Sequence, residues 1–321
     1  MTGAHTSVAA SAQRHGRYRL IKGDSFRWLA RRADGSIHAV VTDPPFGVVE
    51  YHPDQIEKRN NGTGGRWRLP QTYDGYTRRP MPRFTTLTAK HLQEISRFQG
   101  RLAPELFRVL VPGGHVMIAT QTLLSHLVIN AFVLVGFQLR GQIARTVSTL
   151  RGGDRPKFAH DEYPNLSVVP RSAWEPWLLF RKPLDGLVRE NLEKWKTGAL
   201  RRPSRDAPFR DLIVSAPARG EERRIADHPS LKPQAFMRQL VAAALPLQQG
   251  VILDPFAGSG STIAAASAMG LESIGIELHP DYYRMARRAI PKLAALHVDA
   301  GAQDRGAREN RTAGPREVAD R

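Results

Sequence analysis

The sequence contains no cysteine among its 321 residues. This absence excludes disulfide bonds, cysteine-ligated zinc, iron–sulfur clusters and every mechanism that uses a thiol nucleophile. The 11 histidines are scattered without the spacing of a metal site, so we expect no metal. No apolar run approaches the length of a membrane span, and the first residues contain no apolar signal segment. We therefore expect a cytoplasmic protein that does not bind a membrane.

Acidic residues are scarce relative to basic ones. The chain has 30 Asp and Glu against 47 Lys and Arg, which gives a formal net charge of +17. Such a surplus favours a polyanionic partner, and nucleic acid is the first candidate. The chain is also 41% hydrophobic and has 5 Trp, so it can bury enough apolar surface to fold. Its length suits one large α/β domain with insertions.

Short runs rich in Val and Ile alternate with helical patterns along most of the chain. The runs predict buried strands over residues 38–42, 115–120, 177–181, 251–254 and 273–277. The helical patterns cover residues 92–110, 233–244, 262–269 and 281–296. This alternation predicts an α/β fold with a doubly wound, mostly parallel sheet.

A glycine-rich turn follows the predicted strand 251–254. Asp254 is followed by Gly258 and Gly260, and the next helix begins at Ser261 and Thr262. Glycines let a ligand approach the backbone closely, and Glu277, at the end of the next strand, can accept both hydroxyls of a ribose. An acid before the turn suits an ammonium or sulfonium group better than a pyrophosphate. The alternative is a tight structural turn without a ligand.

A second acidic turn follows the predicted strand 38–42, with the sequence Asp43-Pro44-Pro45-Phe46. Two prolines remove two N–H donors, so carbonyl groups and the Asp43 carboxylate form a cluster of acceptors. Such a cluster fits the exocyclic amine of adenine or cytosine, whose growing positive charge it would stabilise. Phe46 would stack on a base that has been flipped out of the duplex. The alternative is a proline turn with an incidental acid.

Together these two turns resemble the DNA amino-methyltransferases of the N6-adenine/N4-cytosine type. The catalytic turn precedes the cofactor turn, which is the β-class order. The segments beginning at Gly23, Glu105, Trp174 and His228 also resemble family segments. The resemblance implies a Rossmann-like methyltransferase fold with permuted motif order and S-adenosyl-L-methionine as cofactor. It assigns the catalytic role to Asp43, Pro44, Pro45 and Phe46, and the cofactor site to Asp24, Lys232, Asp254, Phe256, Gly258, Gly260, Ser261, Thr262 and Glu277.

The resemblance also divides the chain. It implies a catalytic half over residues 18–182, which includes a basic loop at 55–90, and a cofactor-binding half over 228–297. Residues 183–227 match no family segment, and we interpret them as an inserted target-recognition subdomain. Residues 1–17 and 298–321 are expected to be disordered tails. Phe46 stands where the family more often has Tyr, which keeps the stacking surface and removes a hydroxyl.

The expected reaction is methylation of adenine N6 in double-stranded DNA, as in restriction-modification systems. The absence of cysteine excludes methylation at carbon 5 of cytosine, which requires a thiolate. Adenine is favoured because Asp at the first position of the catalytic motif accompanies adenine more often in the families that this chain resembles. Methylation of cytosine N4, an inactive DNA-binding protein, and methylation of RNA or of a protein amide are the alternatives. The target sequence, a homodimer and a cognate restriction nuclease stay open.

Overall fold

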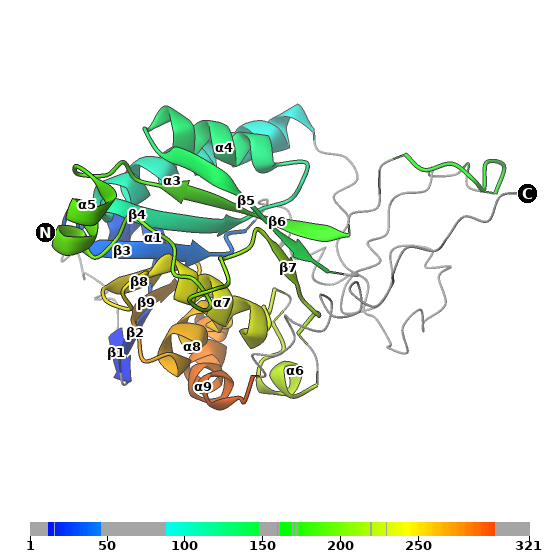
Figure 1. Ribbon diagram of the computed structural model, residues 1–321. Helices are drawn as coiled ribbons and strands as arrows, with labels where there is room; N and C mark the ends of the chain where they lie inside the picture. Colours follow the sequence, from blue (N-terminus) through cyan, green and yellow to red (C-terminus); the bar gives the residue numbers. More distant parts are fainter. Residues whose placement is uncertain are drawn as a thin grey trace, which may run out of the picture.

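The described residues form one nine-stranded sheet with helices on both faces (Figure 1). The computed structural model describes residues 12–15, 17–45, 88–147, 159, 161–168, 170, 173–218, 220–228 and 230–298. The strand order is β1-β2-β9-β8-β3-β4-β6-β5-β7. Strands β2, β9, β8, β3 and β4 run parallel to one another. The strand β1 pairs antiparallel with β2, and β6 pairs antiparallel with both β4 and β5, so β5 and β7 run in the same direction as β4. The prediction of a doubly wound, mostly parallel α/β sheet is confirmed.

Four strands form one end of the sheet, from β1 to β8 in this order. Their bounds are Ala12–His15 for β1, Tyr18–Lys22 for β2, Glu272–Glu277 for β9 and Val251–Asp254 for β8. The remaining strands are β3 (Ile37–Thr42), β4 (Leu110–Ala119), β6 (Trp174–Arg181), β5 (Gln138–Thr146) and β7 (Leu212–Val214).

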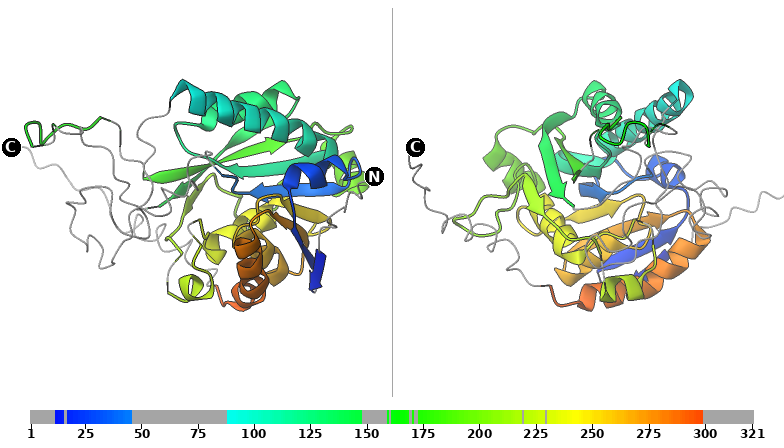
Figure 2. Two further views of the ribbon diagram at one scale, coloured as in Figure 1. Left: turned by 180° about the vertical axis from the view of Figure 1, so that it is seen from behind. Right: turned by 90° about the vertical axis from the view of Figure 1, so that its right-hand side faces the viewer.

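Two groups of helices cover the two faces of the sheet (Figure 2). On one face lie α1 (Ser25–Ala30), α3 (Ala89–Val109) and α4 (Ser125–Leu134). On the other face lie α7 (Gln234–Ala244), α8 (Ser261–Ala268) and α9 (Pro280–Ala295). The smaller helices α5 (Val188–Trp195) and α6 (Glu221–Ile225) pack at the rim, against β4 and α9 respectively.

The central strands are apolar because both of their faces are buried. In β3, Val40 packs in the core under α3 and α4, whereas its neighbours Ala39 and Val41 pack in the core under α7. All three side chains are fully buried. A strand that is covered on both sides has a continuous apolar sequence rather than an alternating one, which is the pattern that predicts β3, β8 and β9.

The candidate site residues are positioned by the contact between β3 and β8. These strands pair in parallel, with Ala39 opposite Ile252 and Val40 opposite Leu253. In the sequence β3 follows β2, but in the sheet β9 and β8 lie between these two strands. The strand order therefore changes direction at this point, and ligands of doubly wound sheets bind beside the carboxyl ends of such strands. Asp43 directly follows β3, and Asp254 is the last residue of β8.

Residues 183–227 pack on the main body. The helix α5 lies at the amino-terminal end of β4, where Asn191 donates a hydrogen bond to the carbonyl of Pro112 at 3.1 Å. The strand β7 pairs in parallel with β5 and extends the main sheet at its edge. In Figure 1, α5 and β7 lie at opposite ends of the molecule. The role of this segment in target recognition stays a prediction.

The structure places a strand at residues 12–15, within the predicted N-terminal tail 1–17. These residues form β1, which pairs antiparallel with β2 from Ala12 opposite Ile21 to His15 opposite Tyr18. Main-chain hydrogen bonds make this edge pairing, so it leaves no apolar pattern in the sequence. Residues 299–321 of the predicted C-terminal tail, and residues 55–87 of the predicted basic loop, lie outside the described residues.

The predicted strands and helices agree with the structure to within a few residues at most ends. The exception is β4, which begins at Leu110, where we expected the helix 92–110 to end and a loop to follow. In the part of the chain that the structure describes, no helix is both long enough and apolar enough to cross a membrane.

Candidate active site

The turn after β3 places a buried carboxylate at the edge of the sheet. The Asp43 side chain is 15% exposed. Pro44 is buried and Pro45 is exposed. Thr42, the last residue of β3, donates a hydrogen bond from its hydroxyl to Asp254 Oδ1 at 2.7 Å. This bond joins the ends of the two acidic turns directly. Phe46, the fourth residue of the predicted catalytic motif, lies outside the described residues.

Asp254 is held by three donors at the end of β8. Besides Thr42, the backbone N–H of Phe256 donates to Oδ1 at 3.1 Å, and the Thr262 hydroxyl also bonds to the carboxylate. Asp254 is only 3% exposed. Burial raises the pKa of this carboxyl group to about 6, although the three donors oppose the shift, and the nearby Asp43 contributes to the increase. The predicted acid before the glycine turn is therefore a desolvated carboxylate.

Glu277 connects the end of β9 to the glycine turn. Its Oε2 accepts a hydrogen bond from the Gly258 backbone N–H at 2.8 Å, and its Oε1 accepts one from the His279 N–H at 2.7 Å. Burial raises the pKa of Glu277, and these backbone donors oppose the shift. The parallel pairing of β8 and β9 explains this proximity, since their carboxyl ends lie side by side.

Two glycines of the turn have backbone conformations that disfavour a side chain. Gly258 has φ of +52°, and a Cβ atom there would lie 3.1 Å from the His228 ring. Gly260 has φ of +81°, and a Cβ atom there would overlap Ile290 Cγ1 on α9. The glycine at 260 is thus required by the packing of α8 on α9, while Gly258 brings the turn close to His228.

The segment around Asp24 packs against the same turn. The Gly23 N–H donates to the Glu277 carbonyl at 2.9 Å, and the Ser25 hydroxyl donates to the carbonyl of Pro255. Asp24 itself caps α1 by accepting from the Arg27 N–H at 2.8 Å. This predicted cofactor residue therefore lies beside the ends of β8 and β9.

Phe256 lies in the glycine-rich turn, and Ser261 and Thr262 are the first residues of α8, which follows it. The Phe256 ring packs on Phe98 of α3, with ring centroids 5.6 Å apart. Ser261 is 6% exposed and Thr262 is 3% exposed. The Ser261 hydroxyl accepts from the Lys232 N–H at 3.3 Å and lies 3.2 Å from the Ser259 hydroxyl. Both predicted helix-start hydroxyls thus already have partners within the protein.

Lys232 contacts both the turn after β3 and the start of α8. Its Nζ lies 2.6 Å from Asp43 Oδ2 and 3.2 Å from Glu175 Oε1, while its backbone N–H reaches Ser261. The sequence predicts Lys232 only as a cofactor residue, and it does not predict Glu175 or its partner Arg145 at all. An acid within the apolar run 174–181 is the available signal for Glu175, because a buried acid needs a partner. Arg145 gives no such signal.

The site has the chemical features that the expected cofactor requires. Two desolvated carboxylates, Asp254 and Glu277, lie beside a turn whose glycines have positive φ. Desolvated acids suit a ligand that combines a positive charge with hydroxyl groups. The residues present therefore fit a sulfonium nucleoside. The described residues contain no group of three or more His, Asp or Glu that could hold a metal ion.

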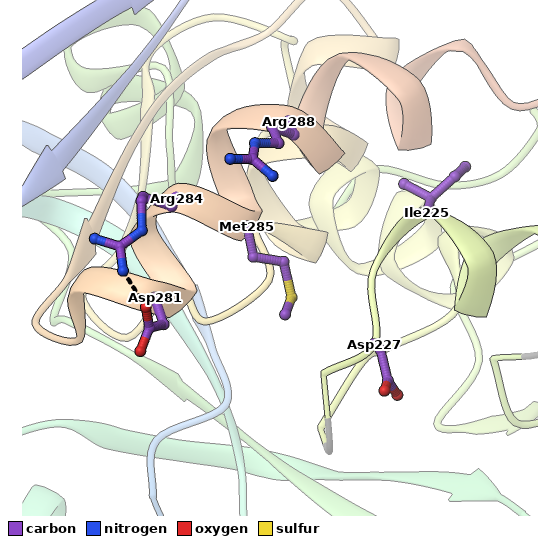
Figure 3. Close-up of a pocket in the computed structure, with 6 residues that line it drawn as sticks. All are labelled: Ile225, Asp227, Asp281, Arg284, Met285 and Arg288. Atoms are coloured by element: carbon purple, nitrogen blue, oxygen red, sulfur yellow. Dashed lines mark hydrogen bonds and ion pairs between the residues drawn. The ribbon is translucent and has the colours of Figure 1, made fainter.

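A shallow pocket of about 340 Å³ lies elsewhere, between α6 and α9 (Figure 3). Its lining contains none of the predicted site residues, and in Figure 3 the side chains of Asp281 and Arg284 on α9 are paired with each other. We therefore place the site from the strand ends and not from this pocket. The pocket is lined by Ile225, Asp227, Asp281, Arg284, Met285 and Arg288.

Comparison with known proteins gives one family. Residues 37–288 match the family model described as DNA methylase, of the N6/N4 type. The type II methyltransferase M.HindIII of Haemophilus influenzae is 26% identical over 294 residues, which is 83% of this chain and 93% of that protein. The DNA adenine methyltransferase YhdJ of Escherichia coli is 39% identical over 74 residues, which is 23% of this chain and 24% of that protein.

Two solved structures share the fold. TTHA0409 of Thermus thermophilus, described as a DNA modification methylase and complexed with S-adenosyl-L-methionine, has a TM-score of 0.51 and 21% identity. That alignment covers 86% of this chain and 95% of the other. The cytosine-N4-specific PvuII DNA methyltransferase has a TM-score of 0.57 and 14% identity, with 92% of each chain covered. At these identities the likeness concerns the fold.

Proposed function

We propose, from the premise that the chain belongs to the N6/N4 DNA methylase family, that it methylates N6 of an adenine in duplex DNA. The family makes the chain a DNA amino-methyltransferase that acts on adenine N6 or cytosine N4. The choice of adenine, the flipping of the base and the roles of single residues are our proposals.

One observation carries the proposal: Asp43 and Asp254 lie at the ends of adjacent strands, and Thr42, the residue before Asp43, donates a hydrogen bond to Asp254. Asp43 Oδ2 is paired with Lys232, whereas the buried Oδ1 has no hydrogen-bond partner among the described residues. A buried acceptor without a donor is costly unless a ligand supplies one. In our proposal, the amine of the flipped base donates to this oxygen and becomes a better nucleophile.

S-adenosyl-L-methionine is the methyl donor, and it supplies an electrophilic methyl group on a sulfonium. We assign its binding to the carboxylates of Asp254 and Glu277 and to the turn that contains Gly258 and Gly260. Asp24, Phe256, Ser261 and Thr262 complete this set as residues beside the turn. Because the site brings amine and methyl group together, we expect proximity and electrostatic stabilisation to supply most of the rate enhancement.

Adenine is our choice of base for two reasons. Asp at the first position of the catalytic motif resembles the adenine enzymes, and YhdJ, which matches 74 residues of this chain, is named a DNA adenine methyltransferase. The likeness to the cytosine-N4-specific structure concerns the fold, which both classes share. Cytosine N4 is therefore the second candidate.

Nucleoside analysis by mass spectrometry tests the proposal. Purified protein is incubated with isotope-labelled S-adenosyl-L-methionine and bacterial genomic DNA, and the hydrolysed nucleosides are measured. We expect labelled N6-methyladenine and no labelled N4-methylcytosine. Label in cytosine alone would overturn the choice of base, and no label in DNA would favour an inactive DNA-binding protein. An RNA sample run in parallel tests the RNA alternative.

Two aspartate variants provide the control. Asp43→Ala removes the proposed acceptor, whereas Asp34→Ala removes a carboxylate that is 77% exposed and pairs with Arg108 far from the site. We expect Asp43→Ala to abolish labelling and Asp34→Ala to retain it. Full labelling by Asp43→Ala would show that the acceptor mechanism is wrong.

A further inference from the structure

Four charged side chains form a buried chain that ends at Asp43. Lys232 Nζ bridges Asp43 at 2.6 Å and Glu175 at 3.2 Å, and Arg145 Nη1 lies 3.1 Å from Glu175 Oε2. The exposed fractions of these side chains range from 5% for Arg145 to 15% for Asp43. Two negative and two positive groups alternate, so the formal charges of the chain balance.

Each member comes from a different part of the fold. Asp43 follows β3, Lys232 lies just before α7, and Glu175 and Arg145 are opposite each other on β6 and β5. The Trp177 indole also donates to Glu175 Oε1 at 3.0 Å. The cluster therefore connects the turn after β3 with the neighbouring strands β6 and β5.

Arg145 is itself held in place by residues that follow β7. Its Nε donates to the Ser215 hydroxyl at 3.1 Å, and its Nη2 donates to the Ala216 carbonyl at 3.3 Å. Its guanidinium also lies over the Phe236 ring, 5.0 Å from the centroid. The orientation of Glu175, and through it that of Lys232, is thus constrained from several sides.

Stability alone is a weak explanation for this cluster. Desolvation of two ion pairs costs much of what their attraction returns, and apolar replacements of buried ion pairs are often equally stable. A buried charged cluster beside a reacting group is more often functional, because it controls protonation and orientation there.

We propose that Lys232 is a positioning residue for Asp43, and that Glu175 and Arg145 hold Lys232 in place. The Lys232 ammonium group pairs with Asp43 Oδ2 and keeps the carboxylate ionised. Asp43 Oδ1 is then left as the acceptor for the amine of the base. This role rests on the proposed function and adds to the cofactor contact that the family resemblance gives Lys232.

The electrostatics of the site agree with this geometry. Burial raises the pKa of Asp43, Lys232 and Arg145 oppose that shift, and Glu175 adds to it. Asp254, at the end of the neighbouring strand, is a further negative group beside Asp43. Burial would lower the pKa of Lys232, but the carboxylates of Asp43 and Glu175 outweigh it and raise this pKa. Lys232 is therefore a cation that keeps Asp43 available as an acceptor.

Substitution of Lys232 tests the proposal through the pH dependence of kcat. Without the ammonium group, Asp43 should take up a proton at higher pH, so Lys232→Met should move the acid limb of the kcat profile upward by about one unit or more. At a pH on the wild-type plateau close to that limb, kcat should fall roughly tenfold or more. Lys232→Arg keeps the charge and should restore most of both.

Substitution of Glu175 should shift the same limb in the opposite direction. Glu175→Gln keeps an oxygen that can accept from Lys232 but removes a negative charge beside Asp43, so the acid limb should move to lower pH. The double variant should have an acid limb between those of the single variants. A purely structural cluster would lower the melting temperature in both variants without opposite shifts.

The outcomes are distinguishable. Opposite shifts of the acid limb of kcat, measured at saturating S-adenosyl-L-methionine so that a lost cofactor contact does not affect kcat, support the positioning role. Shifts in the same direction, unshifted profiles, or a loss confined to cofactor affinity would overturn it. If Lys232→Met does not fold by circular dichroism, Lys232→Arg and Glu175→Gln decide, since Lys232→Arg should keep the wild-type limb while Glu175→Gln lowers it. An inactive wild-type enzyme would instead refute the proposed function.

Discussion

At the scale of single residues, Asp254 combines deep burial with three hydrogen-bond donors. Its pKa of about 6 lies above the ordinary value of 3.8, so between these values the folded protein holds a proton that the unfolded chain has released. The folded state therefore binds more protons in this window, and stability falls as pH rises through it. The difference corresponds to about 3 kcal/mol.

Asp254→Asn should remove this pH dependence. The amide oxygen can still accept from the Thr42 hydroxyl and the Phe256 N–H, so these two hydrogen bonds survive while the buried charge does not. Relative to wild type, the variant should gain stability as pH rises from about 4 to about 6, by up to about 3 kcal/mol. Urea unfolding of both proteins without cofactor at several pH values measures this. Parallel stability curves would contradict the assignment of a raised pKa to Asp254.

Residue-level prediction works best at the ends of predicted strands. Asp43, Asp254 and Glu277 are each predicted at or directly after the carboxyl end of a strand, where α/β sheets bind ligands, and the structure places these three strands next to one another. Prediction fails for Glu175 and Arg145, since their partners come from segments that are distant in sequence. Lys232 lies 29 residues before Ser261, with which its backbone N–H forms a hydrogen bond, and no local pattern reports such a contact.

At the scale of elements, the close approach of α8 and α9 depends on Gly260. A Cβ atom at this position would clash with Ile290, and the positive φ of +81° adds strain. Gly270 provides a matched control, because its φ of +67° is similar and no heavy atom lies within 4 Å of the place that a Cβ atom would occupy.

Gly270→Ala should therefore cost about 1 kcal/mol of unfolding free energy, which reflects the backbone conformation alone. Gly260→Ala should cost a further 1–3 kcal/mol or so, because Ile290 or the helix axis must shift. Chemical denaturation of both variants gives the two values. Equal losses would show that the contact with Ile290 relaxes freely and that the helices are not packed tightly at this glycine.

Elements covered on both faces are predictable from the sequence, and elements at the edges are not. The strand β5 escapes prediction because its first five residues are exposed and only Leu139 among them has a large apolar side chain. The helix α4 is apolar over most of its length, so its sequence lacks a distinct buried stripe. The strand β1 depends on main-chain pairing with β2, to which side chains contribute no periodic signal.

At the scale of the whole molecule, the net charge of +17 predicts binding to DNA that weakens steeply with salt. Part of this charge lies in the exposed stretch between α5 and β7, where Arg205 and Arg210 are exposed. We propose that these two arginines contact phosphates, as expected if residues 183–227 take part in target recognition.

Replacement of both arginines by alanine should reduce the slope of log K against log salt by about two, since each phosphate contact contributes nearly one. Arg31→Ala is the control, because this arginine is exposed at the end of α1 and lies outside residues 183–227. Fluorescence anisotropy with a labelled duplex at several salt concentrations measures the slopes. An unchanged slope in the double variant would place the DNA on another surface.

The central claim is that the ends of β3, β8 and β9 form one site with divided tasks, in which Asp43 acts on the base and Glu277 holds the cofactor. The most direct test measures both the dissociation constant of S-adenosyl-L-methionine and the single-turnover rate of methyl transfer in Asp43→Ala and Glu277→Gln. Asp43→Ala should bind the cofactor within about threefold of wild type and lose roughly a thousandfold or more in rate. Glu277→Gln should bind it about tenfold or more weakly and keep most of its rate at saturation. A single-turnover rate of Asp43→Ala equal to that of wild type, or equal losses of cofactor affinity in both variants, would contradict the account.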